Sequence, residues 1–236
     1  PRNAVVTVVG DIDPDQILAW ADEYFEDLPA GEIPEPVLLR EPDQSEERRV
    51  EITLDVSPQV RMGWPVVETA DPDAAALTVL SRLLTGGLTS RLHRRLVIED
   101  QVATGVTSSM GPGVRFPAVF AIDATPRSPN TTADIEAAVY AELDSLRRTP
   151  PSERELQRIR NQLEAGEIRR LASNFGLAFQ LSASASNFGD WRTTFGFTDR
   201  LARVEAEDVR RVTERFFTPE HRTVATLVRP DSVVGR

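Results

Sequence analysis

The chain has 236 residues and no cysteine, so disulfide bonds and thiolate metal sites are excluded. Its formal net charge is −10, which argues against nucleic acid as the main partner because phosphates repel an acidic surface. No apolar run in the sequence is long enough to cross a membrane.

The first residues predict a strand, a helix and a linker. Residues 4–9 are apolar and mostly β-branched, which is typical of a buried strand. Asp13 followed by Pro14 is a helix-start pattern. The predicted helix has an apolar face made of Ile17, Trp20, Ala21 and Tyr24 or Phe25. Prolines and acidic side chains over residues 29–47 then predict a solvated linker.

A second unit is predicted from about Arg48 onward, where runs of alternating apolar residues and runs of helical periodicity follow one another. The predicted strands are 50–56, 60–66, 103–110, 116–125 and 224–228. The predicted helices begin near residues 71, 132, 152, 191 and 206. We interpret Trp20, Trp64 and Trp191 as core residues. This order predicts an α+β fold, with an antiparallel or mixed sheet and helices packed on one face.

Residues 86–104, which read GGLTSRLHRRLVIEDQVAT, connect a helix to a strand. We expect Gly86 and Gly87 to form a structural turn in which one glycine is left-handed or closely approached by other atoms. Thr89 or Ser90 would then cap the following helix. The apolar side chains expected to be buried here are Leu88, Leu92, Leu96 and Ile98.

The pattern GG-x-x-SRL followed by LV-x-x-x-Q-x-A resembles the second half of insulinase/pitrilysin-type zinc metallopeptidases, in their mitochondrial-processing-peptidase-like bacterial branch. The resemblance extends from Pro1 to about Pro230. It implies the inactive C-terminal domain of a zinc-dependent metalloendopeptidase, a processing protease whose substrate chamber this domain closes opposite the zinc-bearing half. It also implies a bacterial protein, which we expect to be soluble in the cytoplasm or the periplasm.

On this resemblance the chain divides into three parts. Residues 1–28 would be the terminal strand and helix of a truncated first half, residues 29–47 the linker, and residues 48–236 the non-catalytic peptidase domain. The similarity of residues 1–9 to residues 219–228 supports this division, because the family is built from two similar halves in tandem.

The family takes its zinc ligands from an inverted His-x-x-Glu-His motif and a more distant glutamate. His93 and His221 are the only histidines, and neither stands in that pattern. We therefore expect no catalytic residue and no metal ligand in this chain, and zinc in the missing catalytic half. The expected partners are that half or a homologous subunit, and a peptide substrate, with neither nucleic acid nor membrane.

Many members hold the substrate backbone with an arginine and a tyrosine seven residues apart, and these positions are Val97 and Thr104 here. Valine cannot donate a hydrogen bond and threonine has a shorter reach, so we do not transfer that role. Arg91, from the SRL pattern, either lines the chamber or pairs with a carboxylate, and the structural interpretation is favoured. The candidate chamber-lining residues are Arg91, Val97 and Thr104, and the structural turn consists of Gly86, Gly87 and Ser90.

Two alternatives stay open. One is a non-catalytic structural subunit related to the core proteins of respiratory complexes. The other is a peptide-binding module without hydrolysis.

Overall fold

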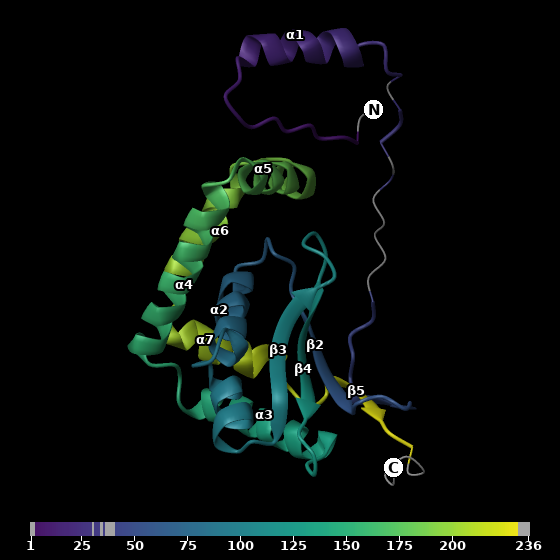
Figure 1. Ribbon diagram of the computed structural model, residues 1–236, viewed down its shortest axis with the longest axis vertical. Coiled ribbons are helices and arrows are strands. Elements are labelled where there is room, and N and C mark those ends of the chain that lie inside the picture. Colours follow the sequence, from purple (N-terminus) through teal and green to yellow (C-terminus); the bar gives the residue numbers. More distant parts are fainter. Residues whose placement is uncertain (1–2, 30, 34, 36–40, 231–236) are drawn as a thin grey trace. The chain divides into compact units, whose positions relative to one another are not determined.

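The computed structural model describes residues 3–29, 31–33, 35 and 41–230, which divide into two compact units (Figure 1). One unit consists of residues 1–42 and 163–198, and the other of residues 43–162 and 199–236. The boundary at Pro42 lies inside the predicted linker. The sequence predicts residues 163–198 in the larger domain, whereas here they belong to the smaller unit. The assignment of residues 1–28 to a preceding half stays a prediction.

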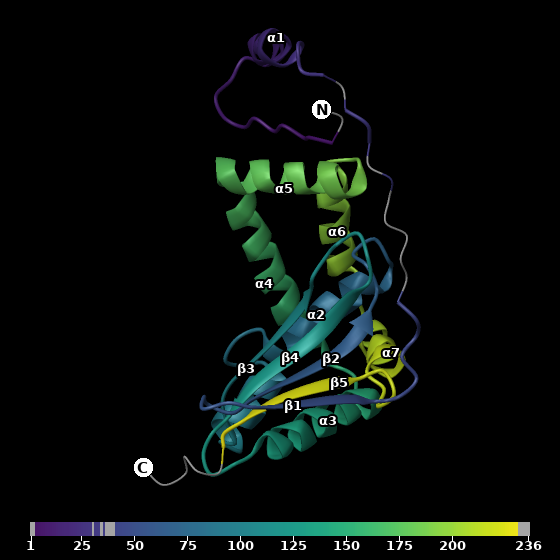
Figure 2. The same ribbon diagram turned by 90° about the vertical axis from the view of Figure 1, so that its right-hand side faces the viewer.

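The larger unit is built on a mixed five-stranded sheet with the order β1-β5-β2-β4-β3. Its strands are β1 (Arg48–Thr53), β2 (Gln59–Val66), β3 (Ala103–Gly111), β4 (Ala118–Pro126) and β5 (Thr223–Val228). β1 runs parallel to β5, whereas the other neighbouring strands are antiparallel. Figure 2 looks onto the strands and shows β1 at the margin of the sheet. The predicted α+β fold with a mixed sheet is confirmed.

Helices pack on one face of this sheet, as predicted (Figure 1). They are α2 (Asp73–Thr85), the π-helix η1 (His93–Glu99), α3 (Thr132–Arg148), the start of α4 (Glu153–Leu171) and α7 (Ala206–Phe216). The predicted capping box at the start of α4 is present, because the Glu155 carboxylate accepts from Ser152 N at 2.9 Å and the Glu155 amide donates to Ser152 Oγ.

The core lies between the sheet and these helices. Met62, Trp64 and Phe120 are fully buried. The rings of Trp64 and Phe120 contact the ring of Phe217, with centroid distances of 5.1 and 4.9 Å. Since successive side chains of a strand point to opposite faces, burying Met62 and Trp64 places Arg61 on the other face.

The smaller unit contains α1 (Pro14–Phe25), the last part of α4, α5 (Asn174–Phe188) and the beginning of α6 (Thr193–Ala202). The predicted start of α1 is confirmed, because Asp13 Oδ1 accepts a hydrogen bond from Asp15 N at 3.0 Å. α5 contacts α6 through the hydroxyl groups of Ser184 and Thr194, which are 2.5 Å apart.

The strand expected at residues 4–9 is wrong, because residues 4–9 form no regular structure. Val5, Val6 and Val8 are exposed. A β-branched run forms a strand only where a neighbouring strand supplies hydrogen bonds, and no pairing of residues 4–9 occurs in the described part of the chain. Residues 223–228 do form a strand, β5, because they pair with β1 and β2.

Several burial predictions were also wrong. Trp20 and Trp191 are exposed, so Trp64 alone among the three tryptophans lies in the core. Leu88 and Ile98 are exposed, whereas Leu92 and Leu96 are buried as expected. The helix after the turn is a π-helix, with Asp100 N donating to Arg95 O. Ile98 comes only two residues after Leu96, so it lies on the opposite side of the helix from the stripe formed by Leu92 and Leu96.

Candidate functional site

A groove of about 500 Å³ lies on the face of the sheet opposite the helices. It crosses all five strands. Ile52 of β1 and Leu227 of β5 lie toward one end, Arg61 of β2 and Asp123 of β4 in the middle, and Thr107 of β3 at the other end. The groove therefore offers apolar surface, a charged pair and a hydroxyl group in sequence across the sheet.

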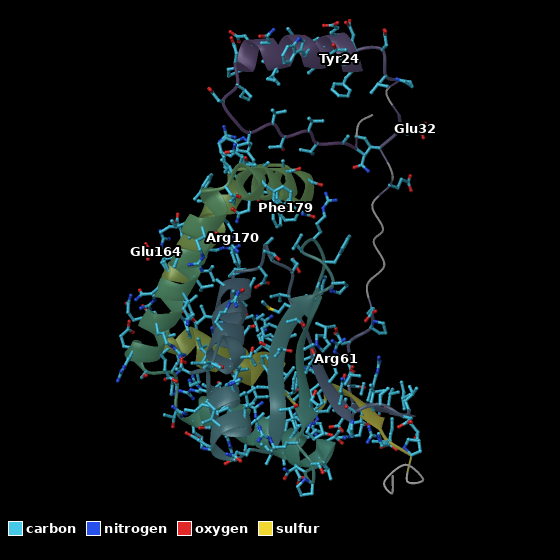
Figure 3. All side chains as sticks on the ribbon, in the orientation of Figure 1. Tyr24, Glu32, Arg61, Glu164, Arg170 and Phe179 are labelled. Carbon is cyan, nitrogen blue, oxygen red and sulfur yellow. The ribbon has the colours of Figure 1, made fainter. Side chains whose placement is uncertain are left out.

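Arg61 and Asp123 are directly opposite each other on neighbouring strands. Arg61 Nε donates to Asp123 Oδ1 at 2.5 Å, and this bond raises the pKa of the guanidinium above its ordinary value. The side chains are 65% and 33% exposed. Figure 3 shows Arg61 on the side of the sheet away from α2. The pair is therefore accessible to a ligand lying in the groove.

The groove has the chemistry of a binding surface. Among the described residues, no three or more His, Cys, Asp or Glu side chains are grouped so that they could hold a metal ion. His93 lies on η1 and His221 in the turn before β5. What the groove can supply is contact area, hydroxyl hydrogen bonds from Thr107 and Thr125, and the exposed guanidinium of Arg61.

Arg91 is held by two carboxylates on the helical side of the molecule. Arg91 Nε donates to Glu155 Oε1 at 2.7 Å, and Nη1 donates to Glu142 Oε1 at 3.3 Å. The Arg91 side chain is only 15% exposed. The hydrogen bond from Arg91 lowers the pKa of Glu155 to about 2. These contacts are those of the structural interpretation, and a chamber-lining role for Arg91 stays a prediction.

Val97 lies in η1 and Thr104 in β3. Val97 is partly exposed and Thr104 is exposed. Thr104 Oγ1 donates to the carbonyl of Thr125, a residue that lines the groove. The groove-lining residue next to Thr104 in sequence is Gly105. Whether Val97 and Thr104 contact a substrate stays a prediction.

The GG turn, formed by Gly86 and Gly87, has a backbone geometry that suits glycine. Gly87 has φ of +107°, and a Cβ on Gly86 would lie 2.4 Å from the carbonyl oxygen of Arg82. Ser90 is buried and its hydroxyl donates to Gly87 O at 2.6 Å. Ser90 thus closes the turn through Gly87, and Arg94 N donates to the Ser90 carbonyl.

Sequence reasoning missed Arg61 and Asp123. Alternation along residues 60–66 does place Arg61 on the polar side of its strand. The pairing of Arg61 with Asp123 depends on the register between β2 and β4, which no local pattern specifies.

Comparisons with known proteins agree with this architecture. Residues 1–163 match the family described as the peptidase M16 inactive domain. The chain is 27% identical over 233 residues to the zinc protease PqqE of Helicobacter pylori, covering 96% of this chain and 52% of that protein. It thus spans about half the length of that curated relative.

Two solved structures show the same fold. A protease from Helicobacter pylori superposes with a TM-score of 0.85 at 24% identity, covering 93% of this chain and 54% of that one. A peptidase M16 inactive domain from Pseudomonas fluorescens superposes with a TM-score of 0.78 at 20% identity, covering 94% and 52%. In the part of the chain that the structure describes, no helix is both long and apolar enough to span a membrane. The match over residues 1–163 shows that this chain belongs to the peptidase M16 family, as an inactive domain of its zinc-protease-like members.

Proposed function

We propose that this chain works as the non-catalytic half of a zinc-dependent peptidase, and that the open face of its sheet forms a wall of the chamber that holds the peptide. The groove across that face carries the proposal, because it is the concave surface on which apolar, charged and hydroxyl groups come together. The relative named zinc protease PqqE supports it, since that protein is about twice as long as the stretch matched here.

The groove suits a peptide in particular. Ile52, Ala225 and Leu227 offer apolar surface to a side chain. Arg61 uses Nε for Asp123, so its two Nη groups can donate to peptide carbonyls. This combination holds the substrate without reacting with it, and the zinc and the general base would come from the other half.

Reconstitution tests the proposal. The chain is mixed with the separately produced zinc-bearing half of its own protein, and cleavage of a quenched fluorescent peptide library is followed with and without a chelator. Chelator-sensitive cleavage that needs both halves is the expected result. Tight association without any cleavage would instead support a structural subunit.

A pair of variants tests the groove. Arg61→Ala should raise KM about fivefold with little change in kcat, because it removes a hydrogen-bonding charge that binds ground and transition states alike. Arg148→Ala is the matched control, since Arg148 is an exposed arginine at the end of α3. Equal KM values for the two variants would show that Arg61 does not contact the substrate.

A further inference from the structure

The outer edge of β1 carries apolar side chains into solvent. β1 ends the strand order of the sheet and pairs with β5 on one side. Val50, Ile52, Leu54 and Val56, in and just after this strand, are each between 41% and 52% exposed. The alternating pattern of the sequence predicts a strand with one buried face. In the larger unit, the apolar side chains of that face are exposed instead.

The backbone of β1 has unused hydrogen-bonding groups along this edge. Arg48 N donates to Arg222 O and Leu54 N donates to Val228 O, so the even-numbered residues face β5. In a parallel pair the intervening residues point the other way, which directs the N–H and C=O groups of Arg49, Glu51 and Thr53 outward. An incoming strand would find three donor and acceptor positions in a row.

The strand at the other margin of the sheet, β3, is less regular than β1. β3 has a register shift between Ala103 and Gly105. Such an irregularity twists an edge strand and interrupts a ladder. The register of β1 against β5 continues without a shift from Arg48 to Thr53. β1 is therefore the margin better prepared to accept another strand.

We propose that β1 pairs antiparallel with β1 of a second copy of this chain, joining the two sheets across a two-fold axis. The axis would pass beside Val50, which would face the partner's Val50. Arg49 would then lie opposite the partner's Glu51 in a hydrogen-bonded pair, since both residues direct their backbone groups outward.

Charge complementarity selects this occupant and this register. Arg49 and Glu51 lie two residues apart on one face of β1. An antiparallel copy therefore forms two equivalent pairs, each joining Arg49 of one copy to Glu51 of the other. Arg49 already binds Glu136 of α3 at 2.8 Å, which holds its guanidinium beside the strand. For Glu51 no ion pair is recorded within the described residues. On the opposite face the exposed Val50 and Ile52 would extend one apolar strip across both copies.

Sedimentation of the full chain measures the predicted dimer. Glu51→Arg should weaken dimerisation at least about tenfold, because two attractive cross-strand pairs become repulsive. Glu51→Pro should do the same by removing an outward N–H, while leaving the bonds to β5 intact. Glu164→Arg is the control, since it makes the same charge change at an exposed position of α4 and should leave dimerisation unchanged. A melting temperature close to that of the unchanged chain shows that each variant is folded.

A single cysteine tests the register. The chain has no cysteine of its own, so Val50→Cys introduces one thiol, which would meet its counterpart at the two-fold axis. Mild oxidation should link Val50→Cys chains at least tenfold faster than Leu88→Cys chains, where the replaced residue is also exposed. Adding Glu51→Pro should abolish this difference.

Either of two results would overturn the proposal. One is a monomer at all accessible concentrations. The other is a dimer that Glu51→Arg and Glu51→Pro leave unchanged, with Val50→Cys no faster to cross-link than Leu88→Cys. An unrelated extended peptide bound at β1, in a chain that stays monomeric, is a case of the first result. The proposal does not depend on the proposed function.

Discussion

Arg91 and Glu155 form a bidentate ion pair, joined by two hydrogen bonds. Arg91 Nε donates to Glu155 Oε1 at 2.7 Å and Arg91 Nη2 donates to Glu155 Oε2 at 3.0 Å. Glu155 Oε2 also accepts from Ser152 Oγ at 2.8 Å, so one carboxylate caps α4 and anchors the helix start after the GG turn. The arginine of the SRL pattern therefore connects two local motifs that are 64 residues apart in sequence.

This pair predicts a specific acid sensitivity. The pKa of Glu155 is lowered from 4.5 to about 2, so its stabilising contribution is fully present above pH 4.5 and is lost as the pH falls through about 2. We expect Glu155→Gln to reduce the free energy of unfolding by about 1–2 kcal/mol at pH 7, a value below the full linkage because the pair is partly solvated. Urea melts at pH 7 and pH 3 check this. The difference between Glu155→Gln and the unchanged chain should shrink at pH 3, and a constant difference would contradict the prediction.

The GG turn predicts a destabilisation that depends on backbone conformation. Replacing Gly86 and Gly87 together with alanine should cost about 1–3 kcal/mol, because Gly87 has positive φ and a Cβ on Gly86 would meet the Arg82 carbonyl. Gly166→Ala in α4 is the matched control. A Cβ there meets nothing within 4 Å, so alanine should stabilise by up to about 1 kcal/mol. Thermal melts would contradict the interpretation if both changes moved stability in the same direction.

Val97 and Thr104, at the positions of the family's substrate contacts, are expected to tolerate larger side chains. Val97→Arg together with Thr104→Tyr should change stability by less than about 1 kcal/mol, because Thr104 is exposed and Val97 partly so, and both long side chains can reach water. Leu96→Arg is the contrasting variant, since Leu96 is fully buried and an unpaired charge there should prevent folding. Loss of folding in the double variant would show that these positions do not border an open space.

Residues 4–9 and β4 should differ in hydrogen exchange. The exposed Val5 and Val6 lie in a stretch without regular structure, whereas Phe120 and Ile122 are buried in a strand paired on both sides. Amides of residues 4–9 should therefore exchange orders of magnitude faster than those of residues 118–124. Mass spectrometry of peptic fragments measures both. Equal protection in a chain shown to be monomeric would mean that residues 4–9 have a partner strand.

Local patterns in the sequence determined most elements of this fold. The start of α1 at Asp13, the capping box of Ser152 and Glu155, and the alternation of residues 60–66 each depend on neighbours within four residues, so the sequence could predict them. The resemblance around residues 86–104 likewise led to the family that the match over residues 1–163 shows.

Tertiary structure alone decided which apolar residues are covered and which polar residues meet. Val50 and Val60 have the same pattern in sequence, yet Val60 is buried under helices and Val50 lies at a sheet margin. The pair of Arg61 and Asp123 arises from the register of two strands whose residues are 62 positions apart. Burial and cross-strand pairing are properties of long-range contacts, and a periodic pattern specifies the face of a strand without specifying what lies against it.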